Sequence, residues 1–202
     1  MKGLILKDFL NMRKTIGFVG LLTVFYTALS IVNKSPWLLN FLTVMLAVIF
    51  PPNALAYDER AKWDVYALTM PVSRRHIVLS KYIVGLIPAA LGCALSIAAQ
   101  CLFSLSEPLD AVVNSLLFFC IGIILLAVTL PILFKYGSEK ARLVMMTAIL
   151  LPMFLSFLFQ GSLDAASQTA IRALPVVIPA AAAAALALSI AVSLGIYRKK
   201  EL

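Results

Sequence analysis

Charged residues are scarce in this chain of 202 residues, where Asp, Glu, Lys and Arg together account for only 13%. Hydrophobic types account for 62%, and the mean hydropathy is +1.01. Soluble globular domains are about 45–50% apolar and about 25% charged, so a soluble helical bundle of this composition would lack the polar surface needed to cover it. The high hydrophobicity also excludes a disordered chain, and three Cys residues are too few for a disulfide scaffold.

The chain also lacks the common patterns of enzymatic and nucleotide chemistry. It has no GxxxxGK[ST] phosphate-binding loop, no GxSxG nucleophile motif and no HExxH metal motif. The single histidine, His76, has no metal-ligand residues near it in sequence, and Cys93, Cys101 and Cys120 show no CxxC spacing. We therefore expect a chain that is not an enzyme and binds no metal or cofactor, in which His76 and the cysteines are structural.

What the chain has instead is six long stretches without Asp, Glu, Lys or Arg, each of 19 to 25 residues. About 20 apolar residues cross the roughly 30 Å hydrocarbon layer as a helix, and a charge at its centre costs about 2.5–3.5 kcal/mol. The predicted fold class is therefore all-α, a polytopic membrane protein forming a single transmembrane domain over residues 1–202. The six predicted spans are residues 15–33, 35–57, 82–106, 111–134, 143–163 and 173–197.

No ionisable residue lies inside any predicted span, which disfavours an ion-coupled transporter. The main polar side chains at membrane depth are those of Asn53, Gln100, Asn114 and Gln160. We expect these side chains to form hydrogen bonds between helices. The small residues at 180–185, with serines further along the last span, favour close helix packing.

The Lys and Arg residues are distributed unequally between the two sides of the membrane. Fifteen of the seventeen lie in segments that face one side, and only Lys34 and Arg172 face the other. Because cytoplasmic segments are enriched in Lys and Arg, both termini are predicted to be cytoplasmic. The net charge of +8 is then a topology signal and gives no reason to expect nucleic-acid binding.

Residues 1–14 admit three interpretations, one of which is a frayed basic tail. On a helix, Leu4, Ile5, Phe9 and Met12 share one face, which predicts a short amphipathic helix lying in the inner interface. The basic start followed by an apolar run also resembles a signal peptide, with a weak cleavage-like triplet at residues 28–30. Cleavage there would leave five spans and spoil the alternation of charge, so we favour the interfacial helix.

The only long polar segment is residues 58–81, predicted to be cytoplasmic between spans two and three. Acidic residues at 58–59 suit a helix N-terminus, and Asp58 with Lys62 and Arg60 with Asp64 are spaced to form i,i+4 pairs. Ser73 is a predicted N-cap for the third span. Trp63 and its helical neighbours form one aromatic face, which indicates either a helix that receives a partner or an ordinary surface helix lying on lipid.

This segment resembles the ABC-2 type permeases, the short six-span subunits of bacterial ABC exporters. The shared pattern is ER-x2-W-x4-L-x2-P-x-SR-x3-V-x2-KY, and the opening residues KDFLNMRKT, with a Lys7–Asp8 pair, resemble that family's interfacial helix. Within the family, the chain is similar to permeases of phenol-soluble modulin exporters. The matching residues are Glu59, Arg60, Trp63, Leu68, Pro71, Ser73, Arg74, Val78, Lys81 and Tyr82.

The resemblance implies a multi-pass protein of a bacterial plasma membrane that works with a separate ABC ATPase subunit. Two permease copies, identical or related, would join two ATPases, and ATP and Mg would be bound by the ATPases. A cytoplasmic coupling helix between spans two and three would seat in a groove of the ATPase and transmit its closure to the spans. The residues to which the resemblance assigns ATPase coupling are Asp58, Glu59, Arg60, Trp63, Asp64, Tyr66 and Leu68.

The substrate follows from weaker signals. An uncharged, apolar lining suits an amphipathic or hydrophobic peptide, of the toxin or antimicrobial type, entering from the inner leaflet. A hydrophobic drug and a lipid-linked molecule are alternative substrates. A subunit that transports nothing and acts as a passive structural partner is a further alternative, which association with an ATPase would distinguish.

Overall fold

The computed structural model describes residues 2–33, 37–63, 66–67, 73–103, 108–158 and 167–199; within 140–158 and 167–174 it describes the backbone but not the side chains. The predicted coupling residues Asp64 and Leu68, together with Gln160, lie outside the described residues. Every element in the described part of the chain is a helix, which confirms the all-α class. The helices are α1 (Lys2–Asn11), α2 (Arg13–Asn33), α3 (Trp37–Arg60), α5 (Arg74–Phe103), α6 (Pro108–Leu158) and α7 (Ser167–Lys199).

Five helical segments of the described chain are long and apolar enough to cross a membrane. They lie in α2, α3, α5, the first part of α6, and α7, with mean hydropathies from 1.8 to 2.9. These segments overlap five of the six predicted spans. The chain is therefore a multi-pass membrane protein. The remaining predicted span, 143–163, is the fifth in chain order; it overlaps the second part of α6, whose side chains are outside the described set, and it stays a prediction.

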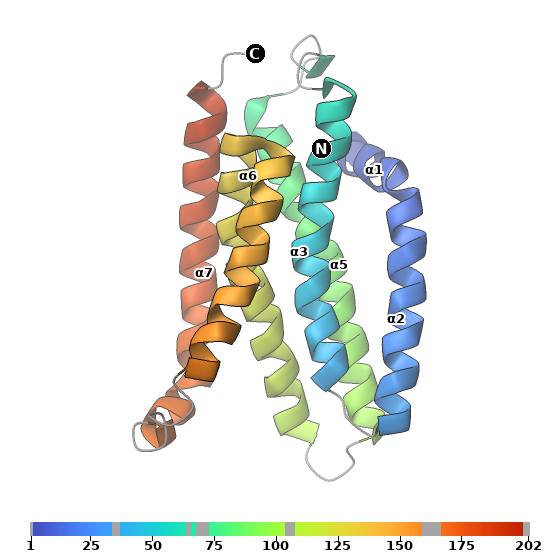
Figure 1. Ribbon diagram of the computed structural model, residues 1–202, viewed down its shortest axis with the longest axis vertical. Helices are drawn as coiled ribbons and strands as arrows, with labels where there is room; N and C mark the ends of the chain where they lie inside the picture. Colours follow the sequence, from blue (N-terminus) through green and yellow to red (C-terminus); the bar gives the residue numbers. More distant parts are fainter. Residues whose placement is uncertain are drawn as a thin grey trace.

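The long helix α6 consists of two limbs joined at Gly137. This glycine has φ 83° and ψ 173°, which breaks the helical geometry. Figure 1 shows the yellow limb rising to the turn and the orange limb descending from it. The residues before and after Gly137 therefore run in opposite directions, as the prediction of separate fourth and fifth spans requires.

Both chain ends lie at the same end of the bundle, together with α1 and the turn of α6 (Figure 1). This end, marked by α1, Glu59, Arg74, Gly137 and Tyr197, is called the charged end below. The charged end carries most of the described Lys and Arg residues. That arrangement agrees with the predicted sidedness, in which both termini face one side of the membrane.

Helix α3 is the centre of the bundle, and α2 and α7 are its edges (Figure 1). In the most apolar window of α3, 67% of residues are buried, compared with 11% in α2 and 17% in α7. Gly92 allows α5 to approach α3 closely, because a Cβ there would lie 3.2 Å from Thr43 Cα and 2.8 Å from Leu46 Cδ1. The apolar faces of α2 and α7 remain exposed, as expected for helices that meet lipid.

The N-terminal helix α1 packs on the bundle through the predicted face. Leu4, Ile5 and Phe9 contact the two buried apolar clusters, and Met12, at the corner between α1 and α2, is fully buried. Leu6 and Leu10 point away from the protein and are more than 60% exposed. One apolar face of α1 therefore packs on the bundle, and a second apolar face, with Leu6 and Leu10, is exposed.

Helices α3 and α5 extend into the two ends of the predicted segment 58–81. Helix α3 continues to Arg60, and Lys62 then adopts a positive φ of 48°. Helix α5 begins at Arg74, and the His76 amide donates a 3.4 Å hydrogen bond to Ser73 Oγ. Ser73 is therefore the N-cap that the sequence predicts. Asp58, expected at the start of a separate helix, lies near the C-terminal end of α3, and Lys81 lies inside α5, as the predicted cap at Ser73 implies.

Candidate functional site

Four charged side chains from three helices form one buried group at the charged end. They are Lys7 and Asp8 of α1, Asp58 near the end of α3, and Lys81 of α5, and they are called the ion cluster below. The side chains of Asp8, Asp58 and Lys81 are only 2–4% exposed, and that of Lys7 is 21% exposed. Two cations and two anions cancel, so the cluster is neutral.

The geometry of the ion cluster is that of an alternating ring. Lys81 Nζ lies 2.7 Å from Asp8 Oδ2 and 2.5 Å from Asp58 Oδ2. Lys7 Nζ lies 2.6 Å from Asp58 Oδ1 and 3.2 Å from Asp8 Oδ1. Each carboxylate thus faces both ammonium groups. Burying charges is tolerated only when they are paired this closely, so the ring holds α1, α3 and α5 in a fixed relation.

Trp63 connects the ion cluster to the segment between α3 and α5. The Lys7 ammonium lies 4.0 Å from the centroid of the Trp63 ring, a cation–π contact. Asp58 pairs with Lys7 and Lys81, whereas the sequence suggested a pair with Lys62 four residues along the same helix. The positive φ of Lys62 ends the helical geometry that such a pair needs.

Glu59 forms a second polar link, to the turn of α6. Its carboxylate accepts hydrogen bonds from the Ser138 amide, at 3.0 Å from Oε1, and from the Ser138 hydroxyl. Ser138 follows Gly137 and begins the second limb of α6, so an anion sits at a helix N-terminus, where the helix dipole favours it. A Cβ at Gly137 would lie 3.1 Å from Glu59 Oε1, which favours glycine there.

Arg74, in the first turn of α5, forms a third polar link, to the end of α7. Its guanidinium donates hydrogen bonds to the carbonyl oxygens of Tyr197, at 3.1 Å, and Arg198, at 3.0 Å. These carbonyls belong to the last turn of α7, where a cation complements the helix dipole. Deeper in the bundle, the Tyr82 hydroxyl lies 2.6 Å from Ser189 Oγ. Serines of α7 thus pack against α5, as the small residues near the chain end predicted.

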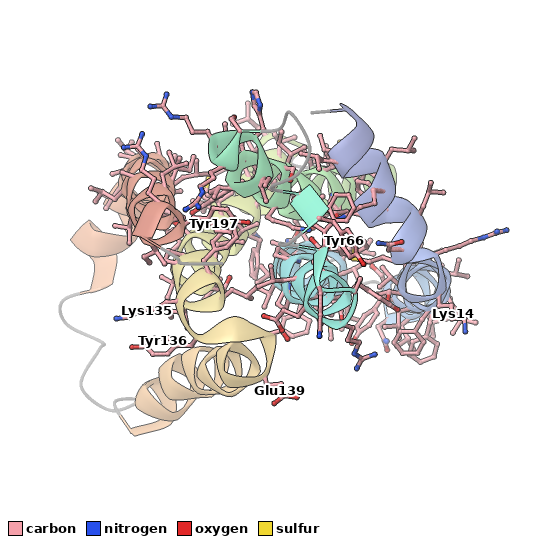
Figure 2. All side chains as sticks on the ribbon, turned by 90° about the horizontal axis from the view of Figure 1, so that it is seen from above. Lys14, Tyr66, Lys135, Tyr136, Glu139 and Tyr197 are labelled. Carbon is pink, nitrogen blue, oxygen red and sulfur yellow. The ribbon has the colours of Figure 1, made fainter. Side chains whose placement is uncertain are left out.

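The segment between α3 and α5 therefore begins and ends in polar links to the other helices of the charged end. Asp58, Glu59 and Trp63 lead into it, and Arg74 and Lys81 follow it. Within the described part of the segment, Arg60 is exposed, Tyr66 is 61% exposed and Ala67 is buried. Figure 2, which views the molecule from this end, shows Tyr66 near the middle of that surface.

The seven predicted coupling residues thus divide by environment. Asp58 is buried in the ion cluster, Glu59 holds the turn of α6, and Trp63 is half-buried against Lys7. Arg60 and Tyr66 are exposed, and Asp64 and Leu68 lie outside the described residues. The sequence reasoning did not assign Lys7, Asp8 or Lys81 as partners of Asp58. Opposite charges at the ends of different spans are the signal that could have suggested the pairing.

A separate polar cluster lies toward the opposite end of the bundle. The Asn40 amide oxygen accepts hydrogen bonds from the Ser96 hydroxyl, from Gln100 Nε2 at 3.0 Å and from the Ser115 hydroxyl at 3.1 Å. All four side chains are buried. The predicted role of Gln100 as an interhelical partner is confirmed, whereas Asn53 bonds the Ile49 carbonyl of its own helix and Asn114 is exposed. This cluster joins α3, α5 and α6.

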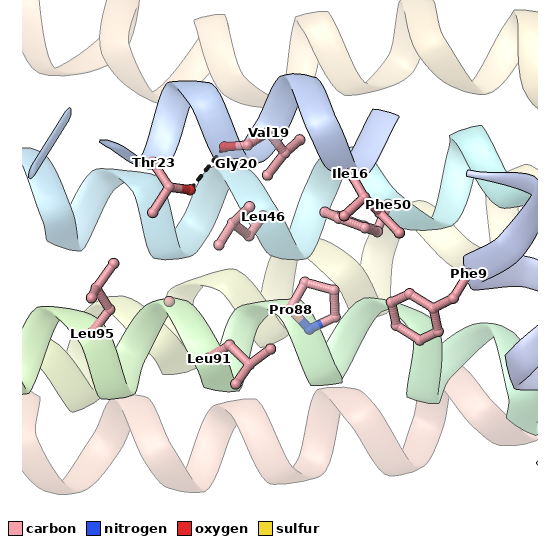
Figure 3. Close-up of a pocket in the computed structure, with 11 residues that line it drawn as sticks. Phe9, Ile16, Val19, Gly20, Thr23, Leu46, Phe50, Pro88, Leu91 and Leu95 are labelled. Atoms are coloured by element: carbon pink, nitrogen blue, oxygen red, sulfur yellow. Dashed lines mark hydrogen bonds between the residues drawn. The ribbon is translucent and has the colours of Figure 1, made fainter. Parts of the chain in front are cut away.

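An apolar groove of about 350 Å³ opens between α2, α3 and α5. Figure 3 shows Leu46 and Phe50 of α3 and Pro88 and Leu91 of α5 along it, with Phe9 of α1 at one end. No charged side chain lines the groove. Such a surface can accept an apolar chain or an apolar helix face, but it provides no group for acid–base or metal chemistry. In the described residues, no cluster of His, Cys, Asp or Glu could hold a metal ion.

A model of a known protein family matches the chain. The model of the family described as "ABC-2 family transporter protein" matches residues 3–198. No curated protein and no solved structure matches the chain. The match covers nearly the whole sequence, including every element of the charged end.

Proposed function

Since the chain belongs to the ABC-2 transporter family and is a membrane permease component of an ABC transporter, we propose that it exports amphipathic or hydrophobic peptides, driven by a separate ABC ATPase that docks on its charged end. The family implies an ABC ATPase partner in general. The observation that carries the proposal for this chain is the set of polar links around the segment between α3 and α5.

The links support a coupling role because they connect one exposed segment to most of the bundle. A displacement of residues 60–73 would act on α1 through the ion cluster, on the second limb of α6 through Glu59, and on α7 through Arg74. Helix α2 would follow α1 through the buried corner at Met12. A force applied by a partner at this segment would then move helices rather than deform a loop.

Within the predicted coupling residues, we assign two different tasks. Arg60 and Tyr66 are exposed and would contact the ATPase, as Arg and Tyr often do at the centre of interfaces. Asp58, Glu59 and Trp63 would hold the segment to the bundle, because their side chains contact α1, α5 and α6. Two permease copies, identical or related, would complete the transporter, as the resemblance implies.

The apolar groove supports the substrate class. Its lining by Phe9, Leu46, Phe50 and Leu91 suits the apolar face of a peptide helix, and its open side would allow entry from the bilayer. The uncharged lining offers no site for a small hydrophilic substrate.

The test is to replace Tyr66 with alanine and measure binding of the ATPase that co-purifies with the chain, together with ATPase activity stimulated by amphipathic peptides. We expect Tyr66→Ala to weaken association about tenfold or more, as for an aromatic residue at an interface centre. Tyr136→Ala is the matched control, because Tyr136 is a tyrosine of similar exposure (52%) at the same end, in α6 (Figure 2).

Three results would each contradict a part of the proposal. An equal loss with Tyr136→Ala would show that docking is not a property of residues 58–68. Unchanged association and unchanged peptide-stimulated turnover in Tyr66→Ala combined with Arg60→Glu would remove the coupling role of this segment. Stimulation by lipids and not by peptides would refute the substrate class while leaving the coupling role intact.

A further inference from the structure

A second groove lies on the other side of α2 from the apolar groove. It has a volume of about 360 Å³ and runs between α2 and α3. Val19 is the one residue that lines both grooves. The residues around the second groove are Lys14, Thr15, Phe18, Val19, Leu22, Ile49 and Asn53.

The lining of this groove is polar at one end and apolar at the other. Lys14 and Thr15 belong to the first turn of α2, next to the charged end, whereas Phe18 and Leu22 follow one and two turns deeper. Helix α3 runs the other way, so its Asn53 lies nearer the charged end than Ile49 does. The polar side chains of the groove therefore lie nearer the charged end, where a polar headgroup could bind. The apolar side chains lie deeper, where a hydrocarbon chain could bind.

Lys14 differs from the cations of the ion cluster. Lys7 and Lys81 are each held by two carboxylates, whereas the described residues provide no ion pair for Lys14, which is exposed. Figure 2 shows Lys14 at the edge of the molecule over α2. Its positive charge is available to an external anion.

The groove is also accessible from the bilayer. Helix α2 is the least buried of the apolar helices, and Phe18 is 62% exposed and Leu21 68% exposed on its surface. Helix α1 turns away at Met12, immediately before α2, so Lys14 stands where a spanning helix enters the membrane. A lysine at that depth reaches the level of lipid phosphates.

We propose that this groove binds an anionic phospholipid of the leaflet at the charged end, with the Lys14 ammonium against the phosphate head and one acyl chain along Phe18, Leu22 and Ile49. The unpaired cation matches an anionic head, and the apolar floor matches an acyl chain. A bound lipid would fill the space between α2, the least buried spanning helix, and α3, the central helix. This site is separate from the groove assigned to the transported peptide.

The experiment compares two lipids with identical acyl chains, phosphatidylglycerol and phosphatidylcholine, binding to the purified full chain by native mass spectrometry. One Lys near the headgroups corresponds to about a fivefold preference for the anionic lipid. We expect that preference in the first lipid bound to the wild type, and its loss in Lys14→Gln. Lys135→Gln is the matched control, because Lys135 is also an exposed cation at the charged end.

A second variant tests the groove rather than the charge. Leu22→Trp fills the apolar part while Lys14 remains, and we expect it to weaken binding of both lipids. Thermal unfolding of each variant checks that the fold is retained. The proposal is overturned if the wild type shows no preference, if Lys14→Gln keeps it, or if Leu22→Trp binds the first lipid as tightly as the wild type does. None of these results depends on ATPase docking or peptide export.

Discussion

The ammonium group of Lys81 holds two carboxylates that come from different helices, Asp8 of α1 and Asp58 of α3. Lys81 is separated from Asp8 by 73 residues in the chain and from Asp58 by 23. The side chain is only 3% exposed, so water cannot replace either contact. Lys81 therefore joins α1 and α3 to α5, in addition to the apolar contacts of α1 with the bundle.

We expect Lys81→Met to destabilise the protein by about 3–5 kcal/mol, because it leaves two buried carboxylates with Lys7 as their one remaining cation. The measurement is reversible unfolding of the purified chain in detergent micelles. Lys135→Met is the control, since Lys135 is exposed and lies near the ring of Tyr136, and we expect it to leave stability unchanged.

A double variant separates charge balance from packing. Lys81→Met combined with Asp8→Asn restores a neutral cluster, so the pair should lose less stability than the two single changes added together. Simple additivity of the two losses would contradict the account of the cluster as a coupled ring.

At the scale of elements, the turn inside α6 depends on a backbone conformation that few residues adopt. Gly137 has φ 83° and ψ 173°, a region available almost only to glycine. The Glu59 carboxylate lies directly against this position and bonds the next residue, Ser138. The reversal of the chain at Gly137 and the link to α3 at Ser138 therefore lie at adjacent residues.

Replacing Gly137 with alanine should cost about 1–3 kcal/mol, because the new Cβ requires a strained backbone and meets Glu59 Oε1 at 3.1 Å. Unfolding in micelles measures the loss. The matched control is Gly17→Ala in α2, where a Cβ meets nothing within 4 Å and the backbone is helical, so no loss is expected. Equal stability of the two variants would exclude the strain at the turn.

At the scale of the whole molecule, the two ends of the bundle differ in chemistry. The charged end holds the ion cluster, the Glu59–Ser138 link and the Arg74 cap, whereas the opposite end holds the uncharged Asn40 cluster. Because cytoplasmic segments are enriched in Lys and Arg, we expect the charged end to face the cytoplasm.

Single cysteines test this orientation in a variant lacking Cys93, Cys101 and Cys120. We expect a membrane-impermeant maleimide to label Asn33→Cys in intact cells, and Ser73→Cys only after permeabilisation. Both positions are exposed and lie at opposite ends of the bundle. Labelling in the reverse pattern would invert the topology and place the proposed docking segment on the wrong side of the membrane.

The sequence by itself determined the membrane class, the positions of five apolar helices, the gathering of Lys and Arg at one end, and the Ser73 cap of α5. Each of these depends on residues close together in the chain: an apolar window, a span-end charge, a serine before a helix. Asp58 and Lys81 bound the predicted cytoplasmic segment 58–81, and both side chains are buried, so their charge alone did not indicate their environment.

Only the tertiary structure decided which charges meet. Lys81 pairs with Asp8 of another helix. Asn40 accepts hydrogen bonds from three side chains of two other helices. Glu59 accepts a hydrogen bond from Ser138 at the turn of α6, 79 residues later in the chain. Hydropathy reports the cost of placing one residue in lipid, whereas a pairing depends on which helix faces pack together. Each helix packs against several neighbours at once, and this packing determines which faces meet. A local sequence pattern therefore shows which residues are charged or polar, but not which of them pair.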